Sequence, residues 1–144
     1  MRVYLDTSVI VAAITGEATA SAIRQWRLTH SPIQVTADWT LTEVASALAF
    51  KVRTRQLEQS QADAAWSVFN RLTDTGALRL LPVSRDDYHQ AANLVRTLDT
   101  GLRAADALHL AIAQAAKVHG FATLDRTQRA SATLVGLNLV DFAG

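Results

Sequence analysis

Cysteine is absent from this sequence of 144 residues, and the chain has only two prolines. Without cysteine there are no disulfide bonds and no thiolate zinc sites, and a reducing compartment is allowed. No apolar run reaches the ~20 residues that cross a bilayer, and the N-terminus lacks the basic start and apolar core of a signal peptide. These absences predict a cytoplasmic protein with no membrane segment.

A strong excess of charge of either sign is also missing, since 14 basic residues face 13 acidic ones. Bulk electrostatics therefore predicts neither strong attraction to nucleic acid nor strong repulsion from it. Hydrophobic residues make up 49% of the chain, which is long enough to bury a core without a disulfide or structural metal. We expect residues 1–144 to form a single domain.

Apolar runs separated by breaks predict that strands alternate with helices. The expected strands cover residues 3–5, 33–37, 78–83, 121–124 and 137–142. The expected helices cover residues 8–14, 18–28, 40–52, 60–75, 85–98, 102–119 and 126–134. This order is typical of an α/β sandwich with a short, mainly parallel sheet of about four or five strands and helices on both faces.

Local signals predict several boundaries of these elements. Thr40 and Glu43 fit a capping box at the start of one helix, and Ser60 and Ser84 are expected to cap two others. Pro82 indicates that the strand over 78–83 is short or lies at an edge of the sheet.

Two aspartates, Asp6 and Asp125, each follow an apolar strand and precede a helix. Each is explained as a helix N-cap, a position that aspartate fills well. Two strands that end alike also suggest a shared role. If the strands are neighbours, about 4.8 Å apart, their carboxylates can share one cation.

Two further carboxylates have both an ordinary and a functional interpretation. Glu43 is explained by the capping box, and Asp106 by exposure to water with Arg103 as a partner. However, the helix that carries Asp106 is otherwise so apolar that its polar sector is a candidate lining for a cleft. Mg²⁺ and Mn²⁺ prefer such oxygen ligands, whereas we interpret His109 as a packing or hydrogen-bonding residue.

Four segments in this order resemble the PIN-domain family, and within it the small bacterial VapC-type ribonuclease toxins of toxin–antitoxin pairs. The segments are LDTSVIVAAI, LTEVASAL, LRAADALHLAIAQAAKVHG and FATLD, and the resemblance runs from Arg2 to about Val140. It implies a PIN-like three-layer α/β/α sandwich that acts as a metal-dependent endoribonuclease. The expected cofactor is Mg²⁺, with Mn²⁺ as the alternative.

The resemblance also implies roles for individual residues. The catalytic, metal-binding acids correspond to Asp6, Glu43, Asp106 and Asp125. The supporting residues are Ser8, Thr7, Arg103 and Thr123. Many relatives carry a further acidic or amide residue shortly after the fourth acid, and here Gln128 is the one residue suited to that part. A second metal site therefore stays open.

Basic residues near these motifs are candidates for binding RNA phosphates, although an ordinary solvated surface is the simpler explanation for them. They are Lys51, Arg53, Arg55, Arg126 and Arg129. The resemblance implies an RNA substrate, a homodimer, and a small antitoxin that inserts a segment near the acidic pocket. The helices over 18–28 and 60–75 are candidates for its groove, whereas Trp26, Trp39 and Trp66 are expected to be ordinary core residues.

Two other classes of function stay open. One is another Mg²⁺-dependent phosphoryl-transfer enzyme, but a haloacid-dehalogenase-like phosphatase needs an aspartate where Ser8 stands. A response-regulator receiver needs a lysine after a late strand, and neither Lys51 nor Lys117 fits. The other class is a non-catalytic RNA- or protein-binding PIN-like module.

Overall fold

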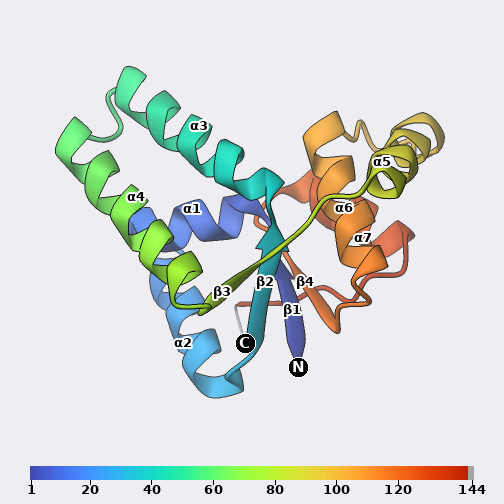
Figure 1. Cartoon of the computed structure of the whole chain (residues 1–144), viewed down its shortest axis with the longest axis horizontal. Helices are drawn as coiled ribbons and strands as arrows, with labels where there is room; N and C mark the ends of the chain where they lie inside the picture. Colours follow the sequence, from blue (N-terminus) through green and yellow to red (C-terminus); the bar gives the residue numbers. More distant parts are fainter. Residues whose placement is uncertain (143–144) are drawn as a thin grey trace.

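The computed structural model describes residues 1–142, which form a parallel sheet flanked by helices (Figure 1). The strands are β1 (Arg2–Leu5), β2 (Ile33–Ala37), β3 (Leu78–Leu81) and β4 (Gly120–Ala122). The helices are α1 (Thr7–Thr15), α2 (Ala20–His30), α3 (Trp39–Arg53), α4 (Gln59–Asp74), α5 (Arg85–Thr97), α6 (Ala104–Ala115) and α7 (Arg126–Leu134).

The strands lie in the order β3-β2-β1-β4, and all three pairings are parallel. The chain moves outward from β1 through β2 to β3, and then returns to place β4 on the other side of β1. The direction in which successive strands are added therefore reverses, and the reversal lies between β1 and β4. In open α/β sheets, ligands bind in the crevice beyond the carboxyl ends of the strands at such a switch point.

The sheet separates two hydrophobic cores, which makes the fold a three-layer α/β/α sandwich. Helices α1 to α4 cover one face and α5 to α7 the other (Figure 1). Along β1, Val3 and Leu5 belong to the first core, whereas Tyr4 belongs to the second. This alternation follows from the two-residue period of a strand, and it explains why β1 is apolar throughout.

Most of the predicted elements are present, and several boundaries agree closely. The strand over 33–37 and the helix over 126–134 have the predicted bounds. Ser84 caps α5, and its hydroxyl accepts a hydrogen bond from the backbone N–H of Asp87 (3.2 Å). β3 lies at an edge of the sheet and ends before Pro82, as the proline predicted.

The predicted strand over 137–142 is wrong, because this segment contributes a single bridge between Phe121 and Leu139. Its neighbour β4 has three residues, which all pair with β1, and only Phe121 also bridges to the segment over 137–142. The predicted helix over 102–119 is also too long. Arg103 has an extended backbone before its start, and Lys117 adopts a left-handed φ of 51° just after its end.

The predicted cap at Ser60 is wrong as well. Helix α4 begins one residue earlier, at Gln59, with Glu58 as its N-cap. The Glu58 backbone N–H donates to the side-chain oxygen of Gln61 (2.8 Å), so a different pair closes this helix start. Among the described residues, no helix is both long and apolar enough to cross a membrane.

Candidate active site

Asp6 stands at the carboxyl end of the central strand β1 and caps α1. Its Oδ1 accepts hydrogen bonds from the backbone N–H groups of Ser8 (3.0 Å) and Val9 (3.3 Å). The cap interpretation is therefore confirmed for this residue. The side chain is only 3% exposed, so a carboxylate is held at the switch point in a largely desolvated place.

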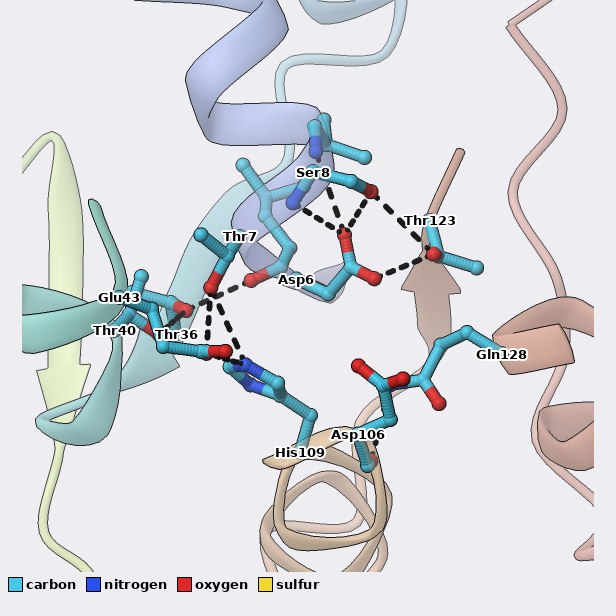
Figure 2. A network of polar contacts seen from close by, with 12 residues as sticks. Asp6, Thr7, Ser8, Thr36, Thr40, Glu43, Asp106, His109, Thr123 and Gln128 are labelled. Carbon is cyan, nitrogen blue, oxygen red and sulfur yellow. Dashed lines mark hydrogen bonds and ion pairs between the residues drawn. The ribbon is translucent and has the colours of Figure 1, made fainter. Parts of the chain in front are cut away.

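Two hydroxyl groups complete the surroundings of Asp6 (Figure 2). The register of β1 and β4 pairs Leu5 with Ala122, so Thr123 follows directly opposite Asp6 and donates to its Oδ2. The Ser8 hydroxyl donates to Oδ1 (2.5 Å) and accepts from the backbone N–H of Leu124 (3.0 Å). Ser8 and Thr123 thus hold the carboxylate from both sides.

Asp106 lies in the first turn of α6, half-buried, and faces the same space as Asp6 (Figure 2). Gln128 ties α7 to this turn, because its Nε2 donates to the backbone oxygen of Asp106 (3.1 Å). The Gln128 side chain is fully buried, and its Oε1 has no hydrogen-bond partner among the described residues. Gln128 therefore helps to fix the backbone of Asp106 in place.

The carboxylates influence one another electrostatically. Burial raises the pKa of Asp106 to about 6, and the negative charges of Asp125 and Asp6 add to the effect. Burial also raises the pKa of Asp6, although hydrogen bonds from Ser8 and Thr123 oppose it. This concentration of negative charge favours the binding of a cation.

Asp125 is exposed and caps α7, where its Oδ1 accepts from the backbone N–H of Gln128 (2.7 Å). The cap interpretation is thus confirmed here too. Because β4 ends at Ala122, Asp125 is not the register partner of Asp6; Thr123 takes that place. The sequence nevertheless placed Asp125 beyond the carboxyl end of β4, as predicted. Its negative charge helps to raise the pKa of Asp106.

Glu43 does not take part in the predicted capping box, because α3 begins at Trp39 rather than after Thr40. The Thr40 hydroxyl is buried against that of Thr36 (2.7 Å). Glu43 instead turns toward the switch point, where its Oε1 accepts from the Thr7 hydroxyl (2.7 Å) and pairs with Nε2 of His109. Burial works to raise the Glu43 pKa, but the His109 and Thr7 contacts outweigh it and lower the pKa.

His109 is 1% exposed and forms hydrogen bonds on both sides of its ring. Its Nδ1 lies 2.6 Å from the Tyr4 hydroxyl, and its Nε2 meets Glu43. A hydrogen-bonding role was predicted for His109, but its partners Tyr4 and Glu43 were not. The spacing was the available signal, because His109 follows Asp106 by three residues and so shares its helix face.

The donor chemistry at the switch point fits Mg²⁺ or Mn²⁺, which prefer carboxylate and water oxygens. Asp6 keeps acceptor capacity on Oδ2, where Thr123 is its one hydrogen-bond donor among the described residues, and Asp106 faces the same space. In residues 1–142, no three His, Asp or Glu side chains converge closely enough to form a complete metal cluster. Water would therefore supply much of the coordination shell, as Mg²⁺ commonly requires.

The predicted basic residues divide between different surfaces. Lys51 lines a groove of about 340 Å³ together with Ser8 and Asp125, and its Nζ pairs with Glu17 (2.8 Å). Arg53 lines a separate groove between α3 and α4. Arg55 follows at the end of α3 that points away from the sheet (Figure 1).

Other predicted residues lie around α6 and α7. Arg126 is exposed beside Asp125, whereas Arg129 reaches back to the backbone oxygen of Val140 (3.5 Å). Arg103 is an exposed N-cap of α6, and no ion pair joins it to Asp106 among the described residues. Among the predicted basic residues, Lys51 shares a groove with Asp125, and Arg126 follows Asp125 in the chain.

A family model described as the PIN domain matches residues 3–139. Solved structures show the same fold at low sequence identity. VapC20 from Mycobacterium tuberculosis, described as a toxin that cleaves the sarcin–ricin loop, is 20% identical with a TM-score of 0.68 and covers 90% of this chain and 94% of its own. No curated protein matches the chain significantly.

Two further structures have the same fold. VapBC2 from Rickettsia felis, bound to a DNA fragment from its promoter, is 15% identical with a TM-score of 0.66. That match covers 97% of this chain and 98% of the other. FitAcB from Neisseria gonorrhoeae is 18% identical with a TM-score of 0.66, and the match covers 98% of both chains.

Proposed function

The chain belongs to the PIN-domain family, and on that premise we propose that it is a metal-dependent endoribonuclease, the toxin of a toxin–antitoxin pair. In this proposal residues 1–144 act as one nuclease domain. Its substrate is RNA, and its cofactor is Mg²⁺ or Mn²⁺.

One observation carries the proposal: carboxylates from four separate parts of the chain lie around the switch point of the sheet, near enough that three of them act on the charge of the fourth. Asp6 follows β1, Glu43 lies on α3, Asp106 on α6, and Asp125 caps α7. The pKa of Asp106 responds to the charges of all three others. Such a concentration of negative charge destabilises the fold unless a cation binds, so its presence supports a metal-dependent activity.

In the proposed site Asp6 and Asp106 hold the ion most directly, and Glu43 and Asp125 complete the acidic pocket. When bound by these residues, a divalent ion would supply Lewis-acid chemistry, namely a lowered pKa for a water and compensation of charge on the scissile phosphate. Ser8, Thr7 and Thr123 orient the carboxylates through the hydrogen bonds described above. Arg103, the exposed N-cap of α6, is proposed to contact the substrate.

Lys51 is the best-supported contact for an RNA phosphate, because it lines the groove that leads to Asp125. Arg126 extends the positive charge next to the same residue. Arg53, Arg55 and Arg129 were also predicted to bind RNA. Their positions support this less, because none of them lines the groove that holds Asp125. Phosphate contacts of this kind supply most non-specific affinity and weaken with salt.

A small antitoxin and a second copy of the chain are the proposed protein partners. One of the similar structures, VapBC2, is described as bound to a DNA fragment from its promoter, which is compatible with a toxin held by a DNA-binding antitoxin and supports such a partner for this chain. Trp66 lines an open groove of about 350 Å³ between α3 and α4, which could receive an antitoxin segment. Trp26 is buried and Trp39 and Trp66 are partly buried, in line with their predicted core positions.

The test is cleavage of total cellular RNA by the purified chain with Mg²⁺, with Mn²⁺ and with EDTA. We expect discrete products that require metal and disappear in Asp6→Asn and Asp106→Asn. Asp74→Asn, an exposed carboxylate on α4, serves as the matched control and should keep full activity. Full activity in a highly purified Asp6→Asn or Asp106→Asn variant would show that the site assignment is wrong.

A further inference from the structure

A line of buried polar contacts connects the central strand to Glu43. It begins at Tyr4 on β1, whose hydroxyl lies 2.6 Å from Nδ1 of His109, and both side chains are almost fully buried. It continues from Nε2 of His109 to Glu43, where the Thr7 hydroxyl also arrives (Figure 2). The line therefore joins β1, α6, α3 and α1 at the switch point.

The two carboxylate oxygens of Glu43 differ in their hydrogen bonds to this network. Thr7 and His109 both contact Oε1, and Oε2 has no hydrogen-bond partner among the described residues. The side chain of Glu43 is 22% exposed, whereas that of His109 is 1% exposed. One oxygen is thus anchored in the protein while the carboxylate as a whole stays accessible.

The anchor depends on the orientation of the His109 ring. A carboxylate oxygen accepts hydrogen bonds, so Nε2 must carry a proton to hold it. A partner on the opposite nitrogen fixes the ring in place, which is how hydrogen bonds beyond the ligands orient a metal site. Tyr4 supplies that partner and is itself stacked on Phe121, with ring centroids 5.5 Å apart.

We infer that His109 is a positioning residue whose Nε2–H, together with the Thr7 hydroxyl, anchors Oε1 of Glu43 and leaves Oε2 for the waters of a bound metal ion. Tyr4 keeps the ring in the orientation that this requires. The part that concerns the metal rests on the proposed function, whereas the anchor itself does not. The inference also explains why a histidine is buried on a helix that is otherwise nearly all apolar.

The anchor is tested first in the metal-free wild-type chain, by ¹H–¹⁵N spectroscopy of the histidine rings at neutral pH. His109→Gln identifies the His109 signals, because they vanish in that variant. We expect a proton on Nε2 of His109. A ring that carries its proton on Nδ1 alone would overturn the inference, since it could not donate to Glu43.

The link to the metal is tested by calorimetric titration with Mg²⁺. Loss of an orienting contact of this kind typically costs 10–100-fold in metal affinity, so we expect His109→Leu to weaken Mg²⁺ binding about tenfold or more. His109→Gln keeps an N–H donor near the place of Nε2 and should restore affinity to within about threefold of wild type. Equal losses in both variants, or no loss in either, would contradict the positioning role.

Two further variants separate orientation from packing. Tyr4→Phe keeps the aromatic ring and removes one hydroxyl, so we expect a smaller loss of Mg²⁺ affinity than in His109→Leu. Thr40→Val removes a comparably buried hydroxyl that contacts Thr36 instead, and it should leave Mg²⁺ affinity unchanged. Because the ring measurement needs neither metal nor RNA, a wild-type chain without nuclease activity would count against the proposed function and leave the anchor in place.

Discussion

Asp6 shows that a structural and a functional interpretation of one residue need not compete. The carboxylate caps α1 through two backbone N–H groups, yet it keeps Oδ2 at the crevice with Thr123 beside it. Asp125 likewise caps α7 and still acts on Asp106 through its charge. At a switch point the residue that follows a strand is also the first candidate cap, so both roles fall on one side chain.

Asp106 should make stability depend on pH in the absence of metal. Its folded-state pKa is about 6 against a usual 3.8, so the folded chain binds this proton more tightly than the unfolded chain. The contribution of Asp106 to stability is therefore present below about pH 4 and is lost as the pH rises through about 6. We expect the free energy of unfolding in EDTA to fall over this window.

Urea denaturation of wild type and Asp106→Asn between pH 4 and 7 measures this contribution as a difference, which cancels the other titrating groups. The asparagine variant should show a weaker fall and match or exceed the wild type at pH 7. A variant less stable than wild type at pH 7 in EDTA would contradict the electrostatic account. Asp74→Asn is again the control.

At the scale of elements, the residue at which α6 starts decides where Asp106 lies relative to the helix end. Because α6 begins at Ala104, Asp106 falls in its first turn, where the positive end of the helix dipole favours an ionised carboxylate. Burial and the neighbouring charges outweigh this effect, as the raised pKa shows. The opposite face of α6 packs into the second core through residues such as Leu108 and Ile112.

Helix α5 depends on its N-terminal cap, and the site does not. The Ser84 hydroxyl accepts from the Asp87 N–H, and the Asp87 carboxylate accepts from the Ser84 N–H (2.9 Å). Ser84→Ala should lower the free energy of unfolding by about 1 kcal/mol, with metal-dependent RNA cleavage unchanged. Chemical denaturation and a cleavage assay check this, and Ser60→Ala, which removes a serine that caps nothing, should cost little.

At the scale of the whole molecule, the sheet order brings distant parts of the chain together. The site combines residues from the first strand and from the last described helix because β4 returns to lie beside β1. Two cores of different helices hold these parts in place on opposite faces of the sheet. A ligand that bridges β1, α6 and α7 should therefore stabilise the complete fold.

Mg²⁺ is expected to raise the thermal midpoint of unfolding. Binding to the folded chain alone adds about 1.4 kcal/mol at a concentration ten times the Kd. The shift should be strongly reduced in Asp6→Asn, which loses the proposed central ligand, and preserved in Asp74→Asn. A wild-type midpoint that does not respond to Mg²⁺ or Mn²⁺ would argue against a metal site at the switch point.

The sequence by itself determined the alternation of strands and helices, the α/β class and the residues at which the carboxylates stand. Each rests on local physics: apolar periodicity, breaks at proline and glycine, and an acid directly after a strand. The edge position of β3 and the cap at Ser84 were predictable for the same reason. The terminal strand over 137–142 was not, because a strand requires a partner and β4 offers one bridge.

The tertiary structure alone decided what each of these residues faces. Local pattern assigned Glu43 to a capping box, whereas packing of α3 across the crevice from α6 turned it toward His109 and Thr7. Register, which no single segment contains, placed Thr123 rather than Asp125 opposite Asp6. Likewise, only the meeting of β1 with α6 brought Tyr4 and His109 together, because contacts between distant segments depend on the whole fold.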